Sequence, residues 1–206
     1  MGLFDEIKNK VTSALKTEVR QSIHEAVNDA SDAVKKFGKE LGSGKSFKFD
    51  KLPTNVDELK ALPEASLDTA FKTTALTILA LTRYEQDPEA VYAMLDFLKG
   101  PEDTNKREEQ FLSERLKDKA YKVMSFFDGA TVENDYTPKI PYKITVYENP
   151  YSFSEENWAT LYVKSGGADS PRPVKLRKKP STGQWFMTEI HCLDDIKTPK
   201  SADPWA

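Results

Sequence analysis

Residues 1–41 carry a continuous stripe of apolar side chains. The stripe recurs with a mean spacing of about 3.7 residues, close to an eleven-residue repeat, and this predicts one long amphipathic helix. A helix of this length cannot bury its stripe against itself, so it needs another surface to cover it. The stripe consists of Phe4, Ile7, Val11, Leu15, Val19, Ile23, Val27, Ala30, Val34, Phe37 and Leu41.

The charges of this segment indicate what kind of surface covers the apolar stripe. Seven basic and seven acidic side chains make residues 1–41 neutral, whereas membrane-surface helices usually carry a cationic face and bulky apolar anchors. The near-eleven period also argues against a standard left-handed coiled coil. We therefore expect a homo-oligomer, or a protein partner, bound through residues 1–41. Docking on the rest of the chain and contact with a membrane surface stay open as alternatives.

Glycines at positions 42 and 44 predict a hinge over residues 42–46, followed by one globular domain over 47–206. A short strand is expected at Ser46–Leu52, where apolar and polar residues alternate. Helical spacing, capping residues and prolines then predict helices between about 54 and 117. These are Thr54–Leu62, a helix that begins at Ser66 or Asp68, a helix from Asp87-Pro88 to Gly100-Pro101, and Thr104–Lys117.

After Phe127 the period changes from helical spacing to alternation, which predicts strands between about 142 and 193 and a tail over 194–206. Helices followed by hairpin-linked strands indicate an α+β fold, with helices packed on one face of an antiparallel, curved sheet. A cone-like sheet wrapped on helices, as in nuclear-transport-factor-like folds, fits this order as a comparison of fold alone. The predicted strands are Tyr142–Glu148, Trp158–Lys164, Val174–Lys178 and Gln184–Leu193.

Composition excludes several classes of protein. The chain has 206 residues, of which 31% are charged, and a net charge of −3, which disfavours nucleic acid as a partner. The single cysteine excludes an intramolecular disulfide and a cysteine-cluster metal site. The first residues lack a secretory signal and no apolar run is long enough to span a bilayer, so we expect a cytoplasmic protein.

Candidate catalytic residues are sparse, because the only histidines are His24 and His191. His191 adjoins Cys192, but neighbours on a strand point to opposite faces, so the two cannot form a nucleophile–base dyad there. We predict no catalytic residue, metal site or cofactor. Alternation predicts a buried Cys192 that shares an inward face with Phe186 and Ile190, while His191 shares the other face with Trp185, Met187 and Glu189.

Basic side chains cluster late in the chain, at Arg172, Lys175, Arg177 and Lys179. Three of them share one face of a predicted strand, and Tyr162 and Trp185 are expected beside them. Such a patch suits an anion, an acidic protein or single-stranded nucleic acid. The alternative, which the acidic remainder of the chain favours, is a solvent-facing surface whose lysines prevent edge pairing.

Two further segments suggest contacts. The Ser165–Ser170 loop contains two consecutive glycines, which can present N–H groups to an anion. Its place between strands favours a hairpin connection instead. Trp205 lies in the tail, where an exposed indole is unfavourable, so we expect it to dock on its own domain or to be bound by a partner.

Several sequence blocks together resemble a known family: FLKGP (97–101), DGATVENDYTP (128–138), YKITVYENPYS (142–152), KSGGADSPRPVKLRKK (164–179) and PKSADPWA (199–206). The chain is similar to an uncharacterised bacterial family, seen mainly in Firmicutes and catalogued only as a domain of unknown function. The resemblance spans roughly Phe47 to the C-terminus. It implies a bacterial, cytoplasmic setting, and it implies no activity, substrate or catalytic residue.

Three hypotheses about function follow from the sequence. The first is a non-enzymatic protein that self-assembles, or binds a protein partner, through residues 1–41. The second is a small-ligand-binding or enzymatic domain with a pocket between the helices and the sheet, favoured by an apolar cavity lined by Tyr, Trp and a lone acid or His191. The third is a peripheral membrane protein.

Overall fold

The computed structural model of the chain describes residues 41, 42 and 44–205. The predicted stripe over residues 1–41 lies outside this part apart from Leu41, so its helix and its covering surface stay predictions. None of the helices in the described part is long and apolar enough to cross a membrane.

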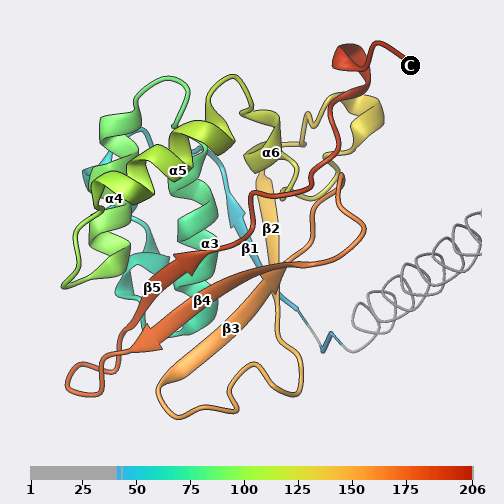
Figure 1. The fold of residues 1–206 in the computed structure, drawn as a ribbon. Helices are drawn as coiled ribbons and strands as arrows, with labels where there is room; N and C mark the ends of the chain where they lie inside the picture. Colours follow the sequence, from blue (N-terminus) through green and yellow to red (C-terminus); the bar gives the residue numbers. More distant parts are fainter. Residues whose placement is uncertain (1–40, 43, 206) are drawn as a thin grey trace, which may run out of the picture. The chain divides into compact units, whose positions relative to one another are not determined.

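Five antiparallel strands form one open sheet in the order β1-β2-β3-β4-β5, so that each strand pairs with its neighbours in the sequence (Figure 1). The helices precede all but the first strand and lie against one face of this sheet. The α+β prediction is confirmed. The strands are β1 (Lys45–Phe49), β2 (Tyr142–Tyr147), β3 (Trp158–Val163), β4 (Arg172–Lys178) and β5 (Trp185–Ile190).

The helices begin where side chains cap them. Asp87 accepts a hydrogen bond from the Ala90 N–H at 3.0 Å, and Pro88 occupies the first turn, as predicted. Asn105 and Glu108 form a capping box, so the last long helix begins two residues later than predicted. The helices are α2 (Val56–Lys60), α3 (Ala70–Leu81), α4 (Pro88–Lys99), α5 (Lys106–Leu116) and α6 (Tyr121–Met124), with 3-10 turns at η1 (Pro63–Ser66), η2 (Val132–Asn134) and η3 (Lys200–Ala202).

Helix α3 is the centre of the core. Eleven of its twelve residues are buried, and it packs on β2, β3, β4 and β5. Its buried threonines are satisfied locally, because Thr74 and Thr77 donate to the carbonyls of Ala70 and Thr73 at 2.9 and 2.8 Å. The predicted start at Ser66 or Asp68 is wrong. Leu67 adopts a left-handed conformation with φ 53°, which ends η1 and prevents a continuous helix.

The predicted faces of the last strand are partly wrong, because β5 contains a bulge. The register slips between Lys175 and Leu176, which leaves Thr188 as an extra residue opposite them. Met187 therefore pairs with Leu176 and is buried, whereas Phe186 pairs with the exposed Arg177 and is only partly buried. A single inserted residue inverts the alternation on one side of it. Beyond the bulge the prediction holds: Ile190 pairs with the buried Val174, and Cys192 is buried.

The predicted hinge is partly joined to the sheet. The Gly42 N–H donates to the carbonyl of Glu148 at 2.8 Å. A β-carbon on Gly44 would lie 2.5 Å from Thr145 Cγ2, so only glycine permits this close approach to β2. Since β1 begins at Lys45, the second half of the predicted hinge belongs to the domain.

Candidate ligand-binding groove

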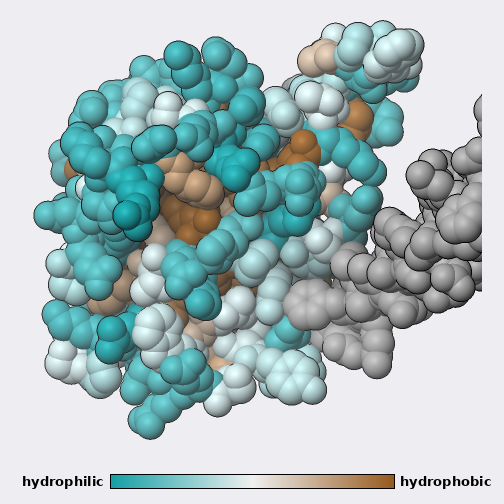
Figure 2. Space-filling view, in the orientation of Figure 1, coloured by the Kyte–Doolittle hydropathy of each residue, from teal (hydrophilic) through white to brown (hydrophobic). Residues whose placement is uncertain are grey.

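A hollow of about 280 Å³ lies between helices α4 and α5 on one side and strand β5 on the other. Figure 2 shows it as a recessed apolar area bordered by hydrophilic surface. We call it the α5 cavity. Its apolar walls are formed by Leu95, Phe111, Leu112, Met187 and Ile190, and its polar lining by Lys99, Thr104, Arg107, Glu108, Thr188, Glu189 and His191.

The pattern of α5 explains why a cavity remains here. This helix buries only Leu112 and Leu116, and apart from the partly buried Phe111 the rest of its residues are polar or charged. Helix α4, in contrast, buries an apolar stripe that includes Met94, Leu95 and Leu98. A helix with a narrow apolar face covers only part of the surface beneath it, so Phe111 faces the hollow and the edge of β5 stays accessible.

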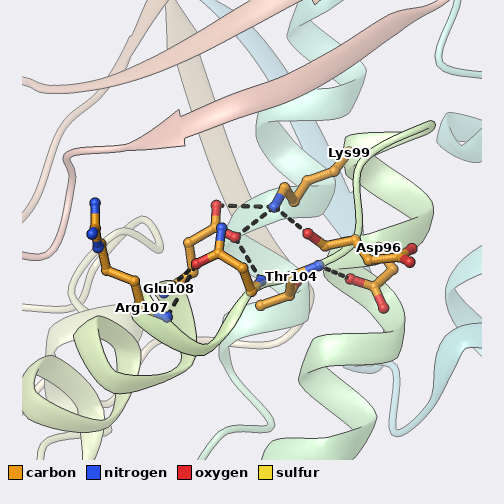
Figure 3. Close-up of polar contacts among 7 residues, drawn as sticks. Asp96, Lys99, Thr104, Arg107 and Glu108 are labelled. Carbon is orange, nitrogen blue, oxygen red and sulfur yellow. Dashed lines mark hydrogen bonds and ion pairs between the residues drawn. The ribbon is translucent and has the colours of Figure 1, made fainter.

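A buried lysine holds α5 in place over the sheet edge. The Lys99 side chain is only 4% exposed, and its Nζ donates to both carboxylate oxygens of Glu108, at 2.7 and 2.9 Å (Figure 3). The same Nζ donates to the carbonyl of Asp103 at 3.1 Å. Asp96 accepts the Thr104 N–H at 2.6 Å, which fixes the connection between the helices. The Lys99 charge is thus compensated inside the protein, and its role is to anchor the wall.

Two threonine hydroxyls on opposite walls of the α5 cavity have no hydrogen-bond partner. Thr104 Oγ1 lies just before α5, and Thr188 Oγ1 belongs to the bulge of β5. Both atoms are buried. Buried polar atoms are nearly always hydrogen-bonded, so two unpartnered hydroxyls on residues that line one cavity are unusual.

The rim of the α5 cavity carries an ion pair. Glu189 contacts the His191 Nε2 at 2.5 Å and the Lys175 Nζ at 3.2 Å. The hydrogen bond with His191, together with that from Lys175, holds the pKa of the Glu189 carboxyl below its ordinary value. His191 is itself 55% exposed, so this pair belongs to the mouth of the cavity.

A second hollow, of about 250 Å³, continues along β5 toward the β4–β5 hairpin. It shares Lys99, Met187 and Thr188 with the α5 cavity, so the two are continuous. We call it the hairpin hollow, and the two together the β5 furrow. The remainder of the hairpin hollow is lined by Pro101, Glu102, Pro180, Phe186 and the basic residues Arg177, Lys178 and Lys179.

The structure spreads the predicted basic patch over the whole length of β4. Arg172 lies at the far end, where its guanidinium donates to the carbonyl of Asp195 at 2.8 Å. Lys175 pairs with Glu189, and the Arg177 guanidinium lies 5.1 Å from the centre of the Trp158 ring. Of these four residues, only Arg177 and Lys179 line the hairpin hollow. Tyr162 lies on the basic face, whereas Trp185 pairs with Lys178 on the inner side.

Two other candidate segments are also placed. Trp205 is 93% exposed, so its side chain does not dock on the domain as we first expected. The tail contacts the domain before this point, through the Ser201 N–H and Asp135. In the Ser165–Ser170 loop, the Gly166 and Gly167 N–H groups donate to Ser125 and Ser165. The loop is a packed hairpin connection, and these two amides are already used.

Cys192 has the structural role that the sequence predicts. Burial raises the pKa of its thiol to about 12, so the thiolate is not formed at neutral pH. Among the residues that the structure describes, no group of three or more His, Cys, Asp or Glu side chains is arranged to hold a metal ion.

Sequence reasoning missed Thr104 and Thr188 as site residues. A signal for Thr188 exists, because Trp185, Phe186 and Met187 are three consecutive large apolar residues in a strand that otherwise alternates. Such a run breaks the alternation, and here it is followed directly by the bulge. Thr104 carries no comparable signal, since its place in the cavity depends on the packing of α5.

The fold and the β5 furrow define a class: an α+β domain with an open antiparallel sheet and an apolar groove beside one edge strand. The chain belongs to the family described as the domain of unknown function DUF6935, which matches residues 51–200. This confirms the resemblance to a domain of unknown function. A search of curated proteins and a search of solved structures both found no match.

Proposed function

We propose that this chain is a non-enzymatic, cytoplasmic bacterial protein whose α+β domain binds a ligand in the α5 cavity. One observation carries this proposal: a hollow with apolar walls is lined from opposite sides by Thr104 and Thr188, whose hydroxyl oxygens are buried and have no hydrogen-bond partner. A mostly apolar hollow with a few convergent polar groups is the usual form of a ligand site. The aromatic wall residue is Phe111, where we had expected Tyr or Trp.

The size of the α5 cavity limits what enters it. Its volume of about 280 Å³ lies at the lower end of ligand sites, which are roughly 300–1,000 Å³. It therefore takes one ring or one branched aliphatic group, with the rest of a larger ligand lying outside. The two hydroxyls donate to or accept from a carbonyl or amide attached to that group.

The titratable groups near the α5 cavity support binding more than catalysis. Cys192 is fully buried with its pKa raised to about 12. His191 lies at the rim, is more than half exposed and is paired with Glu189. A general base needs a place beside the reacting atom, but Cys192 does not line the cavity and the His191 Nε2 is already bonded to Glu189.

Indole is a suitable probe, because its size and its single N–H match the α5 cavity. We expect a titration followed by methyl NMR to shift the signals of Leu95, Leu112, Met187 and Ile190. Thr104→Phe fills the cavity and should weaken indole binding by about tenfold or more. Thr137→Phe, at an exposed position outside the furrow, is the matched control and should bind as the wild type does.

Two results would contradict the proposal. One is indole binding by Thr104→Phe with the wild-type affinity, and the other is methyl shifts confined to residues outside the α5 cavity. The proposal would also be excluded if indole at millimolar concentration shifted none of the methyl signals of the wild-type protein.

Assembly through residues 1–41 is a second proposal, which the neutral, small-residue stripe of the sequence supports. Light scattering of the full chain and of Val19→Asp/Ile23→Asp tests it. We expect the charged pair to lower the mass, while Thr17→Asp/Gln21→Asp, on the side of the predicted helix opposite the stripe, should not. Equal, monomeric masses would exclude self-assembly. Flotation with liposomes, with Phe4→Glu as the control, tests the membrane alternative.

A further inference from the structure

Strand β5 is one of the two edge strands of the sheet, with β4 on one side and the β5 furrow on the other. At its first residue, the outward backbone groups are already used. The Trp185 N–H donates to the carbonyl of Leu67, and the Trp185 carbonyl accepts from Thr73 Oγ1, both at 2.8 Å. After Trp185, no hydrogen bond within the described part of the chain joins the backbone of β5 to a group outside the sheet.

The pairing with β4 shows which later groups point into the furrow. Lys178 lies opposite Trp185, yet its N–H donates to Asn157 on the far side at 2.8 Å. The pair is therefore a non-hydrogen-bonded one, in which both residues direct their backbone groups away from each other. Alternation makes Met187, and after the bulge Ile190, the next residues whose N–H and C=O point away from β4. Both residues line the α5 cavity.

The furrow has the length of a short extended chain. It runs beside β5 from Phe186 to His191, and strands rise about 3.3 Å per residue, so it accommodates about five residues. The wall opposite β5 is formed by α5 and the connection before it, with Phe111 and Thr104. A groove between an edge strand and a helix is a recurrent arrangement for peptides that add a strand to a sheet.

Charge distinguishes the two ends of the furrow. The hairpin hollow is lined by Arg177, Lys178, Lys179 and Lys99, of which Lys99 is compensated by Glu108. The remaining three cations face a single lining carboxylate, Glu102. This end attracts an acidic side chain, whereas the α5 cavity attracts an apolar one.

We propose that the β5 furrow binds an extended segment of a partner protein, which adds a short strand to the free edge of β5. The segment pairs its backbone with Met187 and Ile190 and places one apolar side chain in the α5 cavity. An acidic side chain, a few residues away, lies against Arg177 and Lys179. This inference rests on the proposed function, because the cavity must first accept an apolar group.

The bulge at Thr188 limits which segments bind. A bulge bends its strand and interrupts the ladder, so a long flat strand cannot pair along the whole edge. Helix α5 lies beside the furrow and leaves no room there for a second sheet. Selectivity therefore comes from the apolar and acidic side chains on a short segment, and the backbone bonds supply affinity.

A library of random decapeptides displayed on phage and selected on the full chain tests the proposal. We expect enriched peptides to share one apolar residue and one acidic residue at a fixed spacing. Synthetic copies should shift the amide signals of Met187 to His191 in ¹⁵N NMR. Ile190→Pro removes a backbone donor that faces the furrow and also a side chain of the cavity wall, so Ile190→Ala, which keeps the donor, is its control. We expect the proline variant to bind the peptide about tenfold or more weakly than the alanine variant.

A charge reversal at the basic end of the furrow tests the proposal independently. Arg177→Glu/Lys179→Glu should weaken the binding of acidic peptides by about tenfold or more, and Lys139→Glu, at an exposed position outside the furrow, should not. Indole binding should stay within about twofold in the charge-reversal variant and in Lys139→Glu, because neither changes a residue that lines the α5 cavity. Retained indole binding also shows that these variants are folded, and the dispersion of the ¹⁵N spectrum checks the fold of Ile190→Pro.

The outcomes separate the two proposals. Indole binding without enriched peptides, or enriched peptides unaffected by Ile190→Pro and by the charge reversal, would overturn strand addition and leave the α5 cavity as a small-molecule site. A dimer that Ile190→Pro converts to a monomer would assign the furrow to a second copy of the chain, and would also overturn the proposal. If the wild-type protein bound neither indole nor any selected peptide, both the ligand site and strand addition would be excluded.

Discussion

The two edges of the sheet are protected from unwanted pairing in different ways. Strand β1 carries the exposed Lys45 and Lys48, and charged side chains of this kind discourage another strand from approaching. Strand β5 is instead bulged at Thr188 and recessed beneath α5. The lysines of β1 discourage any strand from pairing with that edge, whereas the recess beside β5 admits a short segment of suitable shape. The comparison therefore indicates β5 as the edge built for contact.

The largest effect is expected from removing the anchor that holds α5 over β5. Glu108→Ala leaves the buried Lys99 ammonium without its carboxylate; since the Glu108 side chain is itself 37% exposed, we expect a loss of about 2 kcal/mol, less than for a fully buried pair. Unfolding by urea measures the loss, and Glu133→Ala, at an exposed position, is the control. An equal stability of Glu108→Ala and wild type would show that the pair does not anchor the wall.

The unpartnered hydroxyl of the bulge provides the next test. Thr188→Val replaces a buried hydroxyl without a partner by a methyl group of similar shape, and should stabilise the protein by about 1 kcal/mol. Thr77→Val is the matched control, because its hydroxyl donates to the Thr73 carbonyl, and should be neutral or destabilising. The same sign and size of effect in thermal unfolding of both variants would contradict our account of Thr188.

Removing the lysines of β1 tests the other edge. Lys45→Thr/Lys48→Thr should leave the free energy of unfolding within about 0.5 kcal/mol of wild type, since both side chains are exposed. It should, however, raise the apparent mass with concentration, because an uncharged edge pairs more readily. Sedimentation measures this, and Lys139→Thr/Lys164→Thr is the control. A mass that does not change with concentration would show that these lysines do not protect β1.

The smallest effect concerns the rim of the α5 cavity. The pKa of Glu189 is lowered in the folded state, so its ionised form contributes stability above the ordinary value of 4.5 that is lost as pH falls through the lower folded value. Glu189→Gln should reduce stability at neutral pH by about 0.5 kcal/mol, since the pair is largely exposed. Wild type and variant should converge in acid. Urea unfolding from pH 3 to 7 checks this, and a constant difference would contradict it.

Local patterns predicted most of the elements. The Asp87 cap and Pro88 placed the start of α4, and alternation placed β2 and β3 within a residue of their observed ends. These signals work because caps and periodicity act within a few residues. The faces of β5 were predicted wrongly before Thr188, because a bulge depends on the partner strand as well as on the strand itself.

The sequence by itself determined the α+β class, the order of the helices and strands, the burial of Cys192 and the membership of its family, because each depends on local pattern or on matched blocks. Only the tertiary structure decided that Thr104 and Thr188 face one cavity and that β5 is recessed beneath α5. The reason is physical. Packing between elements far apart in the chain decides where a surface is left uncovered, and a local sequence pattern contains no information about that packing.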